Sequence, residues 1–382
     1  MSTTSKLVIL NRVVRGEGST GERRPPTTRT RIGGSYSRQG SVRTICLLAL
    51  LTAIGFSSTT TADETTVVVN QRTESVIRGA LRFLQNNQNR NGAWYGLTDR
   101  ERQFPVAMTA YTLMAYQSAG HVPGEGPFGE TVEKGAKFLV GSTSDEGLIG
   151  ERNSGQYMYF HGIATIALAE LYGQTSDDKL RPALERLIKV IIASQNDQGG
   201  WRYRPVVRDA DISVTVLQVV ALRAAKNSGL NVPQRTIDEA VKYVRSCHHD
   251  GSGGFSYQPG QGPGFARTAA AIYSLQVCGQ YDDPMVLAGS RYLEENYEPG
   301  EKWFTYGNFY AAPAQYMIGG KTWENWYGRL QKTLLDSVKK QGDYCHWDTD
   351  LDRGEPVGPI YSTAVYAMIL AMPYQYIPLY QR

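Results

Sequence analysis

The fold is decided by residues 180–228, LRPALERLIKVIIASQNDQGGWRYRPVVRDADISVTVLQVVALRAAKNS. From Leu180 to Ile192, apolar residues recur three to four positions apart between charged ones, which is the pattern of an amphipathic helix. The Gly-Gly-Trp at 199–201 interrupts this helix, because glycine tolerates the left-handed conformation that ends one. The stretch therefore begins with a helix that faces water on one side and then turns.

A second run, from Asp211 to Ala225, is apolar nearly all round. A helix of this kind must be buried on every side. The stretch as a whole therefore predicts a hairpin of one outer helix, which faces water, and one inner helix, which does not.

The same pair recurs six times along the chain. The outer runs begin near Val76, Val132, Leu180, Ile237, Val286 and Trp326. The inner runs begin near Val106, Phe160, Asp211, Phe265, Phe309 and Tyr361. A period of about 50 residues is typical of stacked helical hairpins. An open solenoid leaves one face of each repeat wet, whereas these inner runs have almost no charged face. We predict an all-α (α/α)6 toroid, six hairpins in two concentric layers, over residues 63–382.

The junctions between outer and inner runs share a signature. The tryptophan follows the glutamine by six positions in Gln88…Trp94, Gln195…Trp201 and Gln341…Trp347. Weaker copies include Gly253-Gly254-Phe255 and Gly300…Trp303. We expect the glutamine to satisfy backbone groups at helix ends and the tryptophan to cover the junction.

Residues 78–94, RGALRFLQNNQNRNGAW, resemble the QW repeat of the squalene cyclase and protein prenyltransferase family, and the likeness covers about residues 75–380. The resemblance implies junction loops that lead into inner helices around a central cavity. Aromatic side chains there would cover an isoprenoid or stabilise a cation, or pack the loops. The ligand-binding residues that it implies are Trp94, Tyr157, Tyr159, His161, Arg202, Tyr203, Tyr257, Tyr306, Tyr310 and Tyr361. His161 is either a cavity base or a histidine satisfied in the inner wall.

Asp209-Ala210-Asp211-Ile212 lies where squalene-type cyclases have Asp-x-Asp-Asp. The resemblance makes Asp211 the candidate general acid, with Ile212 in place of the last aspartate. Such an acid must stay protonated, through burial or through a neighbouring carboxylate such as Asp209. The structural alternative is that Asp211 caps the inner helix by accepting from the amide of Ser213 or Val214.

Other polar clusters give weaker signals. Asp343-Tyr344-Cys345 resembles part of the prenyltransferase zinc site, but no histidine opens the next inner run, so we predict no metal and no cofactor. The acids from Asp348 to Glu355 depart from the calcium-loop pattern and predict a solvated loop. A carbohydrate-active toroid is a further alternative, since four acids are available for a carboxylate pair. These acids are Asp209, Asp211, Asp348 and Glu355.

The first 62 residues stand apart from the repeats. Nine Lys or Arg and two acids give them a net charge of +7, although the whole chain carries +4, so nothing predicts a nucleic-acid partner. Residues 1–41 are polar and predict a disordered leader or a mis-called start. Residues 42–62 have the layout of a signal peptide, with a cut after Ala62 and an apolar run too short to span a bilayer. We expect export to the periplasm or beyond.

These observations predict an exported protein that binds a small molecule, such as an isoprenoid, in an aromatic central cavity. One alternative is a terpenoid cyclase-like enzyme that uses Asp211, and another is a carbohydrate-active toroid. The content of the cavity discriminates between them. An isoprenoid needs an apolar chamber, and a sugar needs polar groups on an aromatic floor.

Overall fold

The computed structural model describes residues 67–150, 154–353 and 356–380. The predicted leader and signal peptide lie outside the described residues. The outer helices are α2 (Gln71–Asn86), α5 (Gly129–Gly141), α7 (Arg181–Ser194), α9 (Gln234–Ser246), α11 (Pro284–Glu295) and α13 (Gly320–Ser337). The inner helices are α4 (Pro105–Ser118), α6 (Tyr157–Thr175), α8 (Ile212–Asn227), α10 (Phe265–Val277), α12 (Phe304–Ile318) and α14 (Pro359–Ala371). All six predicted hairpins are present.

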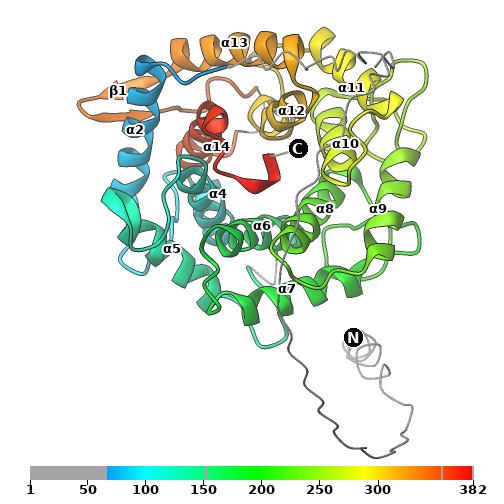
Figure 1. The fold of residues 1–382 in the computed structure, drawn as a ribbon, viewed down its shortest axis with the longest axis horizontal. Helices are drawn as coiled ribbons and strands as arrows, with labels where there is room; N and C mark the ends of the chain where they lie inside the picture. The colour runs from blue at the N-terminus through cyan, green and yellow to red at the C-terminus, as the bar shows by residue number, and fades with distance from the viewer. Residues whose placement is uncertain (1–66, 151–153, 354–355, 381–382) are drawn as a thin grey trace, which may run out of the picture. The chain divides into compact units, whose positions relative to one another are not determined.

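The inner helices form a closed ring, in which each packs against the next and α14 packs against α4 (Figure 1). The outer helices surround this ring, and each of α5, α7, α9 and α11 packs across two inner helices. The predicted (α/α)6 toroid is therefore confirmed. Burial follows the sequence pattern: every residue of α4 from Val106 to Ser118 is buried, whereas α9 buries only one stripe, on the side of Ile237 and Val244.

The junction tryptophans tie each loop to the outer helix before it. The indole nitrogens of Trp94, Trp201 and Trp347 donate to the carbonyls of Leu84, Ile191 and Leu334, at 2.7, 2.8 and 2.8 Å. Each of these carbonyls lies in the last turn of its helix, where the regular amide donor four residues on is missing. The indole adds to the weaker local donors at these helix ends, which are Asn87, Ser194 and Ser337. The tryptophans thus satisfy helix ends while their rings fill the space between the layers.

The junction glutamines link neighbouring repeats. Gln195 donates to the carbonyl of Gly199 in its own loop and to that of Thr236 in the next outer helix, both at 2.8 Å. Gln88 makes the same pair of bonds, to Gly92 and Thr131. Gln341 differs from both.

Gln341 is exposed at the end of strand β1 (Lys339–Gln341), which pairs antiparallel with β2 (Tyr344–His346). This small hairpin was not predicted, and it replaces the glutamine contact at the last junction. The remaining short elements are α3 (Asp99–Arg102), η1 (Gly126–Phe128), η2 (Met372–Tyr374) and η3 (Pro378–Tyr380).

The C-terminal segment fills the axis of the ring at the end where the inner helices finish. Element η3 packs against α6, α8 and α12 (Figure 1). The backbone nitrogen of Leu379 donates to Glu170 of α6 at 3.4 Å, and both Leu379 and Tyr380 are buried. Burial raises the pKa of Glu170 to about 8, against the effect of that hydrogen bond. The repeats give no signal for this insertion.

Cys247, Cys278 and Cys345 are free cysteines, and burial raises the pKa of the Cys247 thiol to about 11. Within the described part of the chain, no helix is long and apolar enough to cross a bilayer.

Candidate functional site

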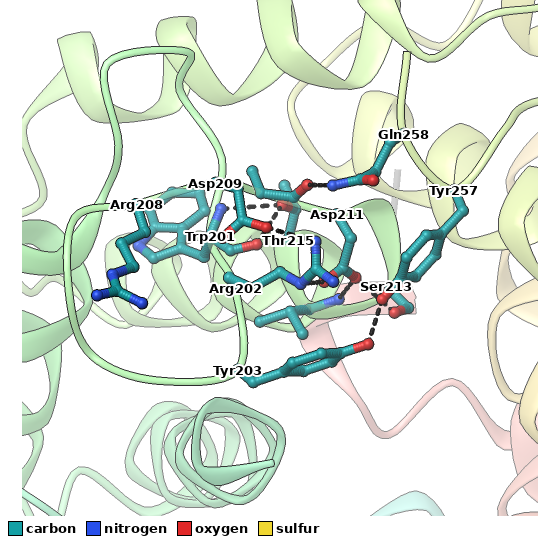
Figure 2. A network of polar contacts seen from close by, with 12 residues as sticks. Trp201, Arg202, Tyr203, Arg208, Asp209, Asp211, Ser213, Thr215, Tyr257 and Gln258 are labelled. Carbon is teal, nitrogen blue, oxygen red and sulfur yellow. Dashed lines mark hydrogen bonds and ion pairs between the residues drawn. The ribbon is translucent and has the colours of Figure 1, made fainter. Parts of the chain in front are cut away.

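Asp211 stands at the start of α8 and is completely buried (Figure 2). Its backbone is extended, with φ −143° and ψ 159°, and its Oδ1 atom accepts from the nitrogen of Val214 at 2.9 Å and from Oγ of Ser213 at 2.6 Å. The predicted N-cap is confirmed. The cap uses only Oδ1, so the other carboxylate oxygen, Oδ2, can contact a different group.

That group is Arg202, whose Nε atom lies 3.2 Å from Oδ2 of Asp211. The Nη1 atom of Arg202 lies 2.8 Å from Asp209, whose side chain is exposed (Figure 2). A cation therefore stands between the two carboxylates that we expected to perturb each other.

The pKa of Asp211 is raised by a different cause. Burial raises the pKa of the Asp211 carboxyl, while the hydrogen bonds from Ser213 and Val214 and the charge of Arg202 oppose the rise. Asp209 does not provide the supporting charge predicted for it, because its carboxylate faces solvent and is paired with Arg202.

Four half-buried tyrosines surround this carboxylate. The hydroxyl of Tyr159 lies 2.5 Å from Oγ of Ser213, and the hydroxyl of Tyr306 donates to the carbonyl of Ser213 at 3.2 Å. The hydroxyls of Tyr203 and Tyr257 bond to each other beside Asp211 (Figure 2). The Asp211 cluster, as we call this site, consists of Tyr159, Arg202, Tyr203, Asp211, Ser213, Tyr257 and Tyr306.

Backbone bonds between loops and helix starts hold the Asp211 cluster in place. The carbonyl of Tyr203 accepts from the nitrogen of Met158 at the start of α6, at 2.9 Å. The carbonyl of Tyr257 accepts in the same way from Ile212 at the start of α8, at 3.0 Å. Each of these loops therefore satisfies a free amide at the start of the inner helix of the preceding repeat, and its tyrosine side chain is fixed relative to Asp211.

Next to the Asp211 cluster, aromatic rings of α4, α12 and α14 meet inside the ring of inner helices. Tyr111 packs edge-on against Phe309 and Tyr361, with ring centroids 5.2 and 4.9 Å apart, and Tyr310 packs against Tyr306 at 5.1 Å. Tyr111, Phe309, Tyr310 and Tyr361 are each at most 7% exposed. Tyr310 and Tyr361 were predicted to bind ligand, and they lie in this packed layer. Tyr111 and Phe309 were missed, because periodicity cannot show which side of an all-apolar helix faces the axis.

Three other predicted ligand-binding residues pack in the wall. Trp94 is fully buried in its junction. His161 is also fully buried, and its Nε2 donates to the carbonyl of Leu187 at 3.0 Å, which links α6 to α7. Burial lowers the pKa of His161 to about 4, so the ring is neutral at pH 7. Tyr157 is buried beside it, with ring centroids 5.9 Å apart. His161 therefore packs in the wall, where it joins two helices.

The remaining acidic clusters have structural roles. Asp352 accepts from the nitrogen of Thr305 at 3.0 Å, so it caps α12 from a distant loop, and the prediction of a solvated loop is wrong for this residue. Asp348 pairs with Lys339, and Glu355 lies outside the described residues. Asp343 is exposed and lies 3.3 Å from Arg82. The described residues contain no group of three or more histidine, cysteine or acidic side chains placed to hold a metal.

No family model matches the sequence, and no curated protein matches it. Similar solved structures include an α-1,6-mannanase of Salegentibacter in complex with α-1,6-mannotriose, at 10% identity and a TM-score of 0.59, over 80% of this chain and 99% of that one. A sugar epimerase from a ruminal bacterium has 12% identity and a TM-score of 0.60, over 80% and 98%. A type II terpene cyclase of Scytonema has 13% identity and a TM-score of 0.52, over 81% and 100%.

These similarities establish an α/α toroid shared with terpene cyclases and carbohydrate-active enzymes. At such low identities they extend to the fold alone, and they identify no family.

Proposed function

We propose that the protein binds a saccharide on the Asp211 cluster. This cluster lies at the end of the toroid where inner helix α8 begins, which we call the mouth. The observation that carries the proposal is the convergence of the Tyr159 hydroxyl, the Tyr306 hydroxyl and the Asp211 carboxylate on Ser213. A polyhydroxylated ring is recognised by polar groups that lie beside aromatic rings. Here the tyrosines supply hydroxyls and rings, and Asp211 supplies a carboxylate.

The packing of the axis favours a saccharide over an isoprenoid. A long apolar chain needs an apolar chamber, whereas rings such as Tyr111 and Tyr310 occupy the axis below the mouth. The C-terminal segment, with Leu379 and Tyr380 buried, occupies its far end. The half-buried tyrosines of the mouth stay within reach of a polar ligand.

The proposal is binding without an assigned chemical step. Glycoside hydrolysis uses two carboxylates on either side of the scissile bond. Asp211 supplies one, but the acid nearest to it in sequence, Asp209, is held in an ion pair with Arg202. No second buried acid belongs to the Asp211 cluster as the described residues define it.

A glycan array probed with residues 63–382 tests the proposal, followed by calorimetric titration of the glycans it selects. Tyr306→Phe removes one hydroxyl and keeps the ring, so we expect affinity to fall about 3- to 10-fold. Tyr376→Phe is the matched control, because Tyr376 is exposed on the C-terminal segment. Binding of geranylgeranyl dihydroxybenzoate, with no glycan bound, would contradict the proposal.

A second candidate, acid catalysis by Asp211, rests on the burial that raises the pKa of this carboxyl. One structural neighbour, the Scytonema terpene cyclase, was solved with geranylgeranyl dihydroxybenzoate as substrate. Conversion of that compound by wild-type protein, lost in Asp211→Asn, would support this candidate over saccharide binding.

We also propose that the chain is exported and that residues 42–62 are removed. The reason is the order of segments that ends at Ala62, a basic residue, then an apolar run, then small residues, which is typical of a signal peptide. N-terminal sequencing of protein recovered from a bacterial periplasm should begin at or near Asp63, and an intact leader on cytoplasmic protein would contradict export.

A further inference from the structure

Trp303 is placed unlike every other tryptophan of the chain. The sequence contains six tryptophans, all within the described residues. Trp303 is 37% exposed, whereas the other five are at most 4% exposed. These five are Trp94, Trp201, Trp323, Trp326 and Trp347. Trp303 thus keeps more than a third of its surface in water, and the Nζ atom of Lys302 lies 5.2 Å from the centroid of its ring. The packing of the core does not account for this position.

The sequence predicted Gly300…Trp303 as a weak copy of the junction signature, in which the tryptophan covers the junction. That prediction is wrong for Trp303. The residue after it, Phe304, is buried instead, and its ring packs edge-on against Tyr297 at 5.6 Å. The junction is thus filled without the indole, which turns outward.

The backbone of Trp303 is strained. Its φ is +66° and its ψ is 26°, the left-handed conformation that bulky residues rarely adopt. Such conformations persist where neighbouring residues fix them, and they concentrate at functional sites. The exposure of the ring does not explain this strain. The strained backbone is therefore a second, independent feature of Trp303.

A distant loop fixes this turn from both sides. Asp352 accepts from the nitrogen of Thr305 at 3.0 Å, which caps α12 just after Trp303. Arg353 pairs with Glu301 just before it, with Nη1 and Oε1 3.1 Å apart. The cap that Trp303 does not provide is therefore supplied from the loop before α14, and the left-handed turn is held between two contacts.

The turn places the indole at the rim of the Asp211 cluster. The ring of Trp303 lies edge-on to that of Tyr306, with centroids 6.5 Å apart. Tyr306 in turn donates to the carbonyl of Ser213, the residue on which the cluster converges. The exposed indole, the tyrosine ring and the hydroxyl network are thus joined by direct contacts.

We infer that Trp303 is a ligand-binding residue that stacks on the apolar face of a sugar ring, while the hydroxyls of that ring reach Tyr306 and Ser213. The inference rests on the proposed function. An indole offers a large rigid face with few rotatable bonds, so little conformational freedom is lost when a ligand covers it. The strained turn holds this face ready before the ligand arrives.

Fluorescence gives a direct test, because Trp303 is the one tryptophan that acrylamide can reach. The probes are α-1,6-mannotriose, cellotriose and chitotriose, titrated into residues 63–382. A trisaccharide that binds should lower the acrylamide quenching constant of wild-type protein. It should not change that of Trp303→Phe, which lacks the exposed indole. Quenching of the wild type that stays constant while calorimetry shows binding would overturn the inference.

Substitution separates a binding role from a structural one. Trp303→Asn removes the ring and tolerates the left-handed conformation. We expect its dissociation constant for the bound trisaccharide to rise about tenfold or more, with a melting temperature equal to or above that of wild type. Trp323→Phe, in the outer wall, is the control and should bind as wild type does.

A lower melting temperature of Trp303→Asn with unchanged affinity would make Trp303 a structural residue and overturn the inference alone. Failure of wild-type protein to bind any glycan of the array, these three trisaccharides included, would overturn the proposed function, and this inference with it.

Discussion

Glu101 of α3 accepts a hydrogen bond from the backbone nitrogen of Tyr361 at 3.0 Å, although 260 residues separate them. The same buried carboxylate accepts from the nitrogens of Leu97 and Thr98, at 2.7 and 3.3 Å. Gly358 lies just before α14, and only glycine fits there, because a Cβ atom would lie 2.2 Å from the carboxyl carbon of Glu101. Glu101 thus joins the first repeat to the last at the point where the ring closes.

Glu101→Ala should destabilise the fold strongly. It leaves three amides without their acceptor, so we expect the free energy of unfolding to fall by about 3 kcal/mol. Urea denaturation followed by circular dichroism measures this change. Glu133→Ala, which removes an exposed partner of Lys137, is the control and should cost less than about 0.5 kcal/mol. Equal losses in the two variants would contradict the closing role of Glu101.

Gly199→Ala should be costly for two separable reasons. The φ of Gly199 is +94°, and a Cβ atom would lie 2.0 Å from the carbonyl oxygen of Glu239 in the next outer helix. Gly229 has a φ of +81° with nothing near its Cβ position, so Gly229→Ala measures the backbone strain alone. We expect about 1 kcal/mol for Gly229→Ala and at least 1 kcal/mol more for Gly199→Ala, by thermal or urea unfolding. Matching values would mean that the close approach of the two repeats is not needed.

Two substitutions of Asp211 should separate its role as a helix cap from a role in ligand binding. Asn caps a helix about as well as Asp, so Asp211→Asn should unfold near the wild-type temperature, while Asp211→Ala should lose about 1–2 kcal/mol. If the carboxylate also serves the Asp211 cluster, Asp211→Asn should lose affinity for the bound glycan in calorimetric titration. Wild-type affinity in Asp211→Asn would leave Asp211 as a helix cap only.

Glu170 should make stability depend on pH. Its pKa in the folded state is raised to about 8 by burial, so between about pH 4.5 and 8 the folded protein holds a proton that the unfolded chain releases. The free energy of unfolding should therefore fall as pH rises through this window, by about 1.4 kcal/mol per pH unit from this group. Below pH 4.5 the full stabilisation is present.

Glu170→Gln should remove this slope, because the amide keeps the acceptor for Leu379 and does not titrate. The measurement is urea denaturation of both proteins at several pH values between 4.5 and 8. Parallel curves for wild type and variant would show that Glu170 does not titrate in the window. Protection of the amide of Leu379 from hydrogen exchange should fall with pH in the wild type alone.

The pattern of apolar residues determined the architecture. The alternation of amphipathic and all-apolar runs fixes which helices face water, and six such pairs bury their inner runs only by closing. The caps and junctions were also readable, since Asp211 and the donors Trp94 and Trp201 act locally, on groups within about 15 residues.

The site depended on contacts that local sequence does not encode. Arg202 stands between Asp209 and Asp211 because the loop of residues 201–211 folds back on itself. The outward turn of Trp303 depends on Asp352, from a loop almost 50 residues later.

The sequence by itself therefore determined the helices, their two layers and the buried cap at Asp211, because periodicity and capping act over one or two turns. The tertiary structure alone decided that the axis is filled, with Tyr111 and Phe309 packed across it and Leu379 bound to Glu170. On an inner helix that is apolar all round, every side is equally able to face the axis. Only the closure of the ring selects which side chains meet there and which hydroxyls are left at the mouth.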